Sequence, residues 1–219
     1  MKALAVTTVA LVLTAASAAA QQRIDETRPA TPGGTVEISN IAGSVRVVAW
    51  NRNEVQVTGT LGRGTERLEF TSEGGRTRIR VVVPRNARNI GGSSLEVRIP
   101  ARSSPAVQTT SANIEITAEQ AATLRATTVS GRVRLNGSSG SVEAESVSGN
   151  LEVEVASPQT HVRSVSGDLT LRGASGTVDA TTVSGNASVE ADRLERLSLT
   201  SVSGRLQFRG DLARGGWYR

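Results

Sequence analysis

The chain has 219 residues, a formal net charge of +5, no cysteine, one histidine and only 2% aromatic residues. Without cysteine the fold cannot rely on disulfides. The scarcity of aromatic side chains argues against nucleic acid as a partner, because bases need stacking platforms.

The charge is unevenly distributed along the chain. Residues 21–110 contain 13 arginines and 8 acidic residues, whereas residues 111–219 contain 11 arginines and 12 acidic residues. An excess of arginine fits an anionic partner such as lipopolysaccharide, phospholipid or an acidic glycan. A plain solvated surface is the alternative interpretation of the same bias.

The first twenty residues have the pattern of a secretory signal peptide. Met1-Lys2 gives a positive start, an apolar run follows over 3–16, and small residues end at Ala20. The run is too short for a spanning helix, which needs about 20 apolar residues, and no cysteine follows that could carry a lipid. We expect cleavage after Ala20 and export to the periplasm, the cell surface or the medium. Residues 21–34 are polar and are expected to form a flexible N-terminal segment.

Residues 35–110 are predicted to be an irregular β half, in which short strands and hairpins are separated by Gly-Gly pairs. The expected strands are 35–39, 44–50, 54–60, 66–72, 77–83 and 95–99. A basic loop with Arg85 and Arg88 lies between the last two strands. It is a candidate contact region, and a solvated loop is the alternative.

The C-terminal half is dominated by an internal repeat. The motif Val-Ser-Gly ends at Gly131, Gly149, Gly167, Gly185 and Gly204, in steps of 18, 18, 18 and 19 residues. Between the motifs, apolar and polar residues alternate with the period of two that is typical of strands. We therefore predict an all-β fold with a β-solenoid over 111–219, built from two short strands per 18-residue coil. The two halves are expected to form one continuous domain, 35–219.

The repeat also predicts which side chains face inward and which form the corners. The expected interior residues are Val142, Ala144, Val147, Leu151, Val153, Val165, Leu169, Leu171, Val178, Ala180 and Val183. Glycine tolerates the backbone of a tight corner, and a preceding serine can bond to nearby amides. The Ser-Gly pairs are therefore interpreted as structural turns: Ser130-Gly131, Ser148-Gly149, Ser166-Gly167, Ser184-Gly185 and Ser203-Gly204.

Little in the sequence indicates catalysis, and we predict no catalytic, cofactor-binding or metal-binding residues. His161 is the one histidine, and nothing specifies its contact with Asp168 or Asp179 in a triad. The pairs Glu143/Glu145 and Glu152/Glu154 keep open a sugar-cleaving β-solenoid enzyme, although solvated outward charges explain them better, because no aromatic platform accompanies them. Calcium-binding nonapeptide repeats need an acidic array that is absent here.

Several stretches resemble a known family. Ile41-Ala42-Gly43-Ser44-Val45, the run 48–55, Leu95–Pro100 and the later Ser-Val-Ser-Gly copies resemble the bacterial β-strand-repeat family of toast-rack type, whose members are called putative adhesins. The resemblance implies an exported or envelope β-solenoid without known catalytic residues. In that family the segment equivalent to 206–218 continues into a further strand, whereas here Trp217 and Tyr218 come at the end. We therefore expect this end to favour self-association.

Three functions are consistent with the sequence. The first is a non-enzymatic envelope or surface protein, an adhesin or scaffold that binds through its solenoid faces. The second is a carbohydrate-active enzyme on the same fold, and the third is a structural element that self-associates through its ends. The candidate contact residues are Arg85, Arg88, Trp217 and Tyr218.

Overall fold

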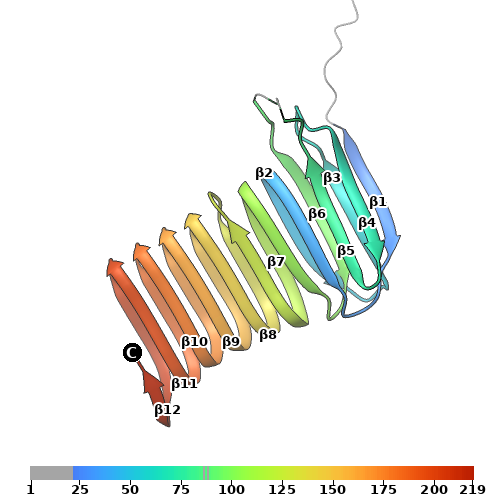
Figure 1. Ribbon diagram of the computed structural model, residues 1–219. Helices are drawn as coiled ribbons and strands as arrows, with labels where there is room; N and C mark the ends of the chain where they lie inside the picture. The colour runs from blue at the N-terminus through green and yellow to red at the C-terminus, as the bar shows by residue number, and fades with distance from the viewer. Residues whose placement is uncertain (1–21, 86, 88) are drawn as a thin grey trace, which may run out of the picture.

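The structure is a computed structural model that describes residues 22–85, 87 and 89–219. The signal-peptide prediction falls on residues outside this description. Twelve strands form one sheet, which winds into a stack of flattened coils (Figure 1). The strands are β1 (Arg23–Pro29), β2 (Thr35–Trp50), β3 (Glu54–Thr60), β4 (Arg67–Glu73), β5 (Arg76–Val82), β6 (Ser93–Pro100), β7 (Ser104–Thr128), β8 (Val133–Ser148), β9 (Leu151–Ser166), β10 (Leu169–Ser184), β11 (Ala187–Ser203) and β12 (Leu206–Tyr218). Within the described part of the chain, no helix is long and apolar enough to cross a membrane.

The C-terminal half is the predicted β-solenoid. Strands β8 to β11 stack in parallel, with Val133 beside Leu151, Leu151 beside Leu169, and Leu169 beside Ala187. Each partner is 18 residues further along the chain, so one strand makes one coil. Each strand also bends near its middle, where the register shifts. The two short strands expected per coil are therefore the two arms of one bent strand, and the all-β solenoid class is confirmed.

Two coils are one residue longer than the others, and each has a local cause. The register between β7 and β8 changes from 19 to 18 residues between Ala118 and Ala121, which places one extra residue at that corner. The register between β10 and β11 changes in the opposite sense at the corner that contains Arg193. Gln120 and Arg193 lie at these corners with φ of 56° and 52°, in the left-handed conformation that is uncommon for residues other than glycine. Each longer coil thus places its additional residue outside the ladder of backbone hydrogen bonds between neighbouring coils.

The N-terminal half is also built on the coil, with extra strands outside it. Strand β2 pairs in parallel with β7, although β3 to β6 lie between them in the sequence. On its other side, β2 pairs with β5 along its first arm and with β6 along its second arm. Strands β4 and β3 then add in antiparallel fashion to β5 and β6. The inserted strands therefore cover the first coil and do not interrupt the stack.

The expected flexible segment 21–34 contains a strand. Strand β1 pairs along its whole length with β3 in antiparallel register, from Arg23 opposite Thr60 to Pro29 opposite Glu54. Its one large aliphatic side chain, Ile24, is buried. Paired backbone amides and an inward isoleucine explain why this polar segment is ordered.

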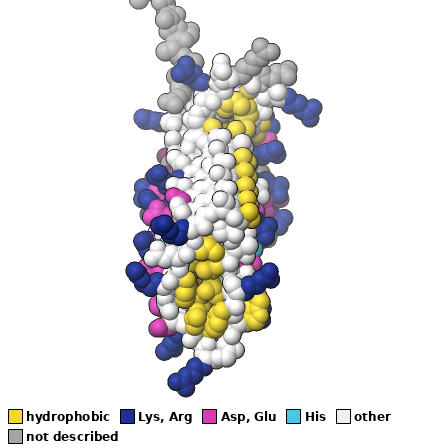
Figure 2. Space-filling view, turned by 90° about the vertical axis from the view of Figure 1, so that its left-hand side faces the viewer, with side chains coloured by type: hydrophobic (Ala, Val, Ile, Leu, Met, Phe, Trp, Pro, Cys, Tyr) yellow, Lys and Arg dark blue, Asp and Glu magenta, His cyan; other side chains and the backbone are white. Residues whose placement is uncertain are grey.

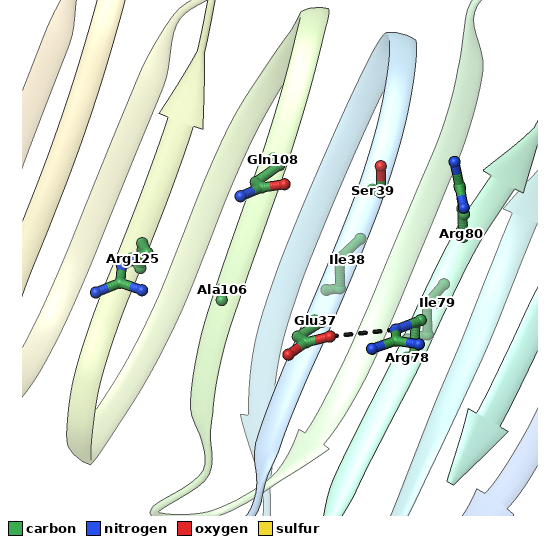
Figure 3. Close-up of a pocket in the computed structure, with 9 residues that line it drawn as sticks. All are labelled: Glu37, Ile38, Ser39, Arg78, Ile79, Arg80, Ala106, Gln108 and Arg125. Atoms are coloured by element: carbon green, nitrogen blue, oxygen red, sulfur yellow. Dashed lines mark hydrogen bonds and ion pairs between the residues drawn. The ribbon is translucent and has the colours of Figure 1, made fainter.

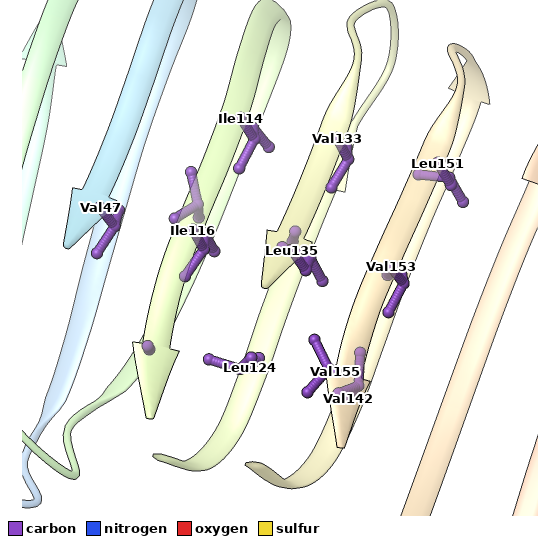
Figure 4. Close-up of a cluster of buried hydrophobic side chains, with 14 of the residues drawn as sticks. Val47, Ile114, Ile116, Leu124, Val133, Leu135, Val142, Leu151, Val153 and Val155 are labelled. Carbon is purple, nitrogen blue, oxygen red and sulfur yellow. The ribbon is translucent and has the colours of Figure 1, made fainter. Parts of the chain in front are cut away.

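The core is a file of aliphatic side chains between the two arms of every coil (Figure 4). Equivalent positions stack directly on one another, so that one row runs through β2, β7, β8, β9, β10 and β11. Its members are Val47, Ile116, Leu135, Val153, Leu171 and Val189, none more than 1% exposed. Burial of each such side chain contributes about 1.5–3 kcal/mol, which lets a chain with few aromatics form a core.

One part of the predicted interior is wrong. Val147, Val165 and Val183 point outward and are 45%, 42% and 40% exposed. The residues before them, such as Ser146 and Ser164, are buried instead. Successive side chains in a strand point to opposite faces, so inward Val142 and Ala144 require residue 146 to face inward and residue 147 to face outward. The hydrophobic character of the valines had outweighed this alternation in the prediction.

Candidate functional site

Rows of alternating charge run across the coils on their outer surface. Residues that face outward at one position of successive strands lie side by side, so the coil spacing of about 4.8 Å sets the spacing of each row. Two such rows are described, and the one on the arm that carries Arg46 and Arg134 is named the second ladder. In it, Arg134 Nη2 lies 2.7 Å from Glu152 Oε2, and Arg46 Nη2 lies 3.7 Å from Glu115 Oε1. The hydrogen bond and charge of Glu152 raise the pKa of the Arg134 guanidinium. The second ladder consists of Glu96, Arg46, Glu115, Arg134 and Glu152.

A first ladder follows the opposite arm of the coil. It consists of Arg78, Glu37, Ala106, Arg125, Glu143, His161 and Asp179. Arg125 Nε donates to Glu143 Oε2 at 2.8 Å, and His161 Nδ1 lies 3.4 Å from Asp179 Oδ2. Strand β7 runs past itself here, since the hydroxyl of Thr109 donates to that of Thr128, one coil on. Ala106 is the single member of this ladder with a small apolar side chain.

The alanine in the first ladder leaves a groove on the outer face of β5, β2 and β7 (Figure 3). The groove has a volume of about 470 Å³. Arg80 and Arg125 lie at its opposite ends, with Ser39 and Gln108 between them (Figure 3). Because the neighbouring ladder positions carry long charged side chains, the methyl group of Ala106 sits at the bottom of a depression.

The groove carries a net positive charge. Arg78, Arg80 and Arg125 line it together with a single carboxylate, that of Glu37. Both oxygens of Glu37 are engaged, because Arg76 Nε lies 3.3 Å from Oε1 and Arg78 Nε lies 3.2 Å from Oε2. Arg80 is exposed and forms no ion pair with any described residue. Its guanidinium therefore remains available for an anionic group.

This geometry belongs to a known family architecture. A family model described as Toastrack DUF4097 matches residues 35–212. The chain belongs to this toast-rack family, which confirms the resemblance noted in its sequence.

A solved structure shows the same fold. A putative adhesin from Bacteroides fragilis is similar over 88% of this chain and 98% of its own, with 14% identity and a TM-score of 0.53. At this identity the likeness is one of fold. A putative adhesin and a putative lipid binding protein from Parabacteroides distasonis match over 91% and 90% of this chain and 98% and 96% of their own. Their identities are 10% and 11%, with TM-scores of 0.38 and 0.35. No curated protein matches the chain.

The Ser-Gly pairs of this toast-rack chain lie at one corner of every coil. Ser148, Ser166, Ser184 and Ser203 are neighbours in register and form an exposed column. Beside them, a Cβ placed on Gly149 would overlap the carbonyl oxygen of Gly131, and the same overlap recurs at Gly167, Gly185 and Gly204. The glycines are thus required by the close approach of successive backbones, in addition to the positive φ of the last three.

An exposed apolar column accompanies the serines. It consists of Val129, Val147, Val165, Val183 and Val202, which are 40–78% exposed. Directly opposite, on the inside of the corner, lies a buried column of hydroxyl side chains: Thr128, Ser146, Ser164 and Thr182. The Ser-Val-Ser-Gly motif therefore encodes four different environments in four consecutive residues.

The toast-rack structure does not bring the sequence-predicted contact residues together. Arg85 is exposed in the loop after β5, and Arg88 lies outside the described residues. Trp217 and Tyr218 are in β12 at the opposite end of the stack (Figure 1). The Tyr218 hydroxyl donates to the backbone oxygen of Leu194 at 3.0 Å. The two candidate regions therefore cannot form one site.

The candidate acid and base residues are engaged in ladders. Glu143, Glu152 and Glu154 are each paired with an arginine of a neighbouring coil, with Arg172 Nη1 2.8 Å from Glu154 Oε1. Among the described residues, no group of three or more histidine or acidic side chains could hold a metal ion.

No sequence motif predicts the residues of the groove. Ser39, Arg80, Ala106 and Arg125 come from four separate stretches, and only the pairing of β5 with β2 and of β2 with β7 places them together. The stretch Ile41–Val47, which resembles a weak Val-Ser-Gly copy, was the one available signal. It indicated that the solenoid starts in this stretch, with hairpins inserted between coils, but not which later strands lie beside it.

Proposed function

We propose that this toast-rack protein is an exported, non-enzymatic envelope or surface protein that binds other envelope components through the outer faces of its coils. The observation that carries the proposal is the groove over Ala106. It is a concave, positively charged interruption in a row of side chains whose members on either side, Glu37 with Arg78 and Arg125 with Glu143, are paired. The excess of arginine in residues 21–110 supports the same face.

The rigidity of the faces suits a binding scaffold. Each outward side chain is held at a defined spacing by a backbone ladder and a buried aliphatic file, so a ligand meets a preformed array. The pattern at the N-terminus supports export, and the adhesin names of similar structures agree with a surface role. Export and binding are proposals here, and both can be tested in one preparation.

The experiment is a binding assay on isolated cell envelope with the purified exported form. We expect retention of the protein on acidic envelope polysaccharide, with no release of new reducing ends from the polysaccharide. The enzyme alternative predicts the opposite, namely sugar release that disappears in a Glu152→Gln or Glu154→Gln variant. An absence of binding to any envelope fraction would contradict the proposal.

Self-association is a second candidate, favoured by β12. This strand is the outermost in the sheet order, and Leu206, Leu212 and Trp217 on it are 40%, 45% and 51% exposed. Hydrophobic side chains gather on the face of the molecule that carries this end (Figure 2). An exposed strand edge with apolar side chains is a template for pairing. Sedimentation at rising protein concentration tests it, and a Leu212→Lys variant should stay monomeric if the edge is responsible.

A further inference from the structure

We propose that the groove over Ala106 is a binding site for an anionic sugar, that is, a sugar ring that carries a carboxylate or a phosphate group. This inference rests on the proposed function and specifies its ligand. The groove is the place where the first ladder is interrupted, between Glu37 on β2 and Arg125 on β7. Its volume of about 470 Å³ falls in the range of small-ligand sites, roughly 300–1,000 Å³.

The walls of the groove supply the contacts that such a sugar needs. Arg80 at one end forms no ion pair with a described residue, and a guanidinium fork matches the two oxygens of a carboxylate or phosphate. Gln108 and Ser39, one on each of two adjacent strands, offer an amide and a hydroxyl for the ring hydroxyls. The Ala106 methyl group provides a small apolar floor for ring C–H groups.

The charge of the groove selects an anion. Glu37 is the only carboxylate in its lining, and Arg76 and Arg78 hold both of its oxygens. At the other end, Arg125 is anchored to Glu143 and positioned by it. A ligand in the groove therefore meets the charge of Arg80 in full. The charges of Arg125 and Arg78 are partly offset by their partners Glu143 and Glu37. Glu69 lies opposite Arg80 on β4 but is paired with Arg67, so an anionic group on the sugar would give Arg80 a counter-charge that a neutral sugar cannot.

The second ladder offers a useful contrast on the same molecule. A comparable depression beside it is lined by Arg46, Glu115 and Arg134. There Arg46 is paired with Glu115 and Arg134 with Glu152, and the alternation is unbroken. Arg132 also lines this depression and, like Arg80, forms no ion pair with a described residue. The difference is the small residue at a ladder position, Ala106, which the second ladder lacks. The anionic-sugar site is therefore assigned to the first ladder, where Ala106 leaves room for a ring.

The shape of the groove favours a sugar over a membrane surface. The groove is a bounded depression between side chains of three adjacent strands, whereas a lipid headgroup layer is recognised by exposed basic clusters that lie against a plane. The ladder residues beyond it are neutralised in pairs and offer no such cluster. Binding to anionic vesicles is accordingly an outcome that would count against the inference.

The test is titration calorimetry of the exported form with three probes. These are oligogalacturonate, its methyl ester and a phosphorylated sugar such as mannose 6-phosphate. We expect binding of one or both anionic probes, and no binding of the neutral ester. Preference between the two anions identifies the source of the charge. Anionic phospholipid vesicles serve as the competing partner, and binding to vesicles without binding to either sugar would overturn the inference.

Two variants locate the site, and a third controls for general effects. Ala106→Gln fills the groove with a side chain of the size that the ladder accepts elsewhere, so it should abolish binding and leave the fold intact. Arg80→Gln should weaken binding by roughly tenfold or more, the usual loss for a charge-assisted contact. Thr170→Gln makes the same change at an outward position of β10 and should leave binding unchanged.

The outcomes separate this inference from the proposed function. If Ala106→Gln loses the soluble sugar and also loses envelope binding, both stand. If the variant still binds both as well as the parent protein does, the groove is not the site. If the parent protein binds neither the soluble sugar nor the envelope, the proposed function itself fails. Circular dichroism of each variant guards against loss of binding through unfolding.

Discussion

The carbonyl oxygen of Gly131 occupies the space that a side chain on Gly149 would need. This one relationship explains why the repeat keeps glycine at the same phase of every coil. Parallel coils can approach to the ladder spacing at this corner only when no Cβ stands between them. The repeated Ser-Val-Ser-Gly sequence is thus a packing requirement, and the function has to be sought in residues that break the regular pattern.

The first prediction concerns this corner. Gly149→Ala places a methyl group against the Gly131 carbonyl, so the coils must separate locally and ladder hydrogen bonds are lost. We expect a loss of stability of about 2 kcal/mol or more, measured by urea unfolding. The neighbouring Ser148→Ala variant, on the exposed column, should change stability by less than about 0.5 kcal/mol. Equal effects of the two changes would contradict the packing account.

The second prediction separates the outward valines from the inward ones. Val165 is 42% exposed, whereas Val153 is fully buried in the aliphatic file. Val165→Thr should therefore cost less than about 0.5 kcal/mol, while Val153→Ala should cost about 2 kcal/mol because it leaves a cavity. Thermal unfolding of the two variants checks this, and a large loss from Val165→Thr would restore the original assignment of that column to the interior.

The third prediction concerns the buried hydroxyl column. Ser164 is fully buried, and its hydroxyl has no hydrogen-bond partner among the described residues. Thr109 is in the equivalent environment near β2, and its Oγ1 lies 3.1 Å from the backbone oxygen of Ala112 and 2.9 Å from the Thr128 hydroxyl, both within hydrogen-bond distance. Ser164→Ala should raise stability by about 1 kcal/mol, and Thr109→Val should lower it by about 1 kcal/mol. Destabilisation by both changes would show that Ser164 has a partner after all.

The fourth prediction addresses the role of the ladders. Their pairs are exposed, so each contributes little by itself, about 0.2–1 kcal/mol. Arg134→Glu, however, places three carboxylates in consecutive coils, because Glu115 and Glu152 lie on either side. We expect a loss of stability at low salt that shrinks in 1 M NaCl, where screening is strong. Arg134→Gln is the matched control, and an effect insensitive to salt would point to packing rather than charge.

The regular half of this fold could be predicted from the sequence because its contacts are periodic. The 18-residue step and the alternation of Leu151 and Val153 with Glu152 and Glu154 determine coil length, arm direction and most of the core. The same alternation is sufficient to place Val147 outside the core. The prediction was wrong there because it gave the hydrophobic character of valine more weight than the alternation of side chains along the strand. The structural reason for the glycines was less accessible, because it depends on the distance between backbones one coil apart.

The N-terminal half could be predicted as strands but not as an arrangement. Strands β3 to β6 were expected within two residues of their observed ends, yet nothing local indicates that β7 returns to lie beside β2. Without that pairing, Arg80 and Gln108 remain 28 positions apart in sequence with no reason to meet. The candidate site was missed for this reason, since it is a property of strand order and not of any motif.

The most direct test of the central claim compares the groove with the repeat in a single binding measurement. Binding of oligogalacturonate should be compared for the parent protein, for Ala106→Gln and for the triple variant Ser148→Ala, Ser166→Ala, Ser184→Ala. We predict that Ala106→Gln loses binding while the triple variant binds as the parent does. Loss of binding in the triple variant with retention in Ala106→Gln would show that the ligand is bound by the repeated corner, and would contradict the account.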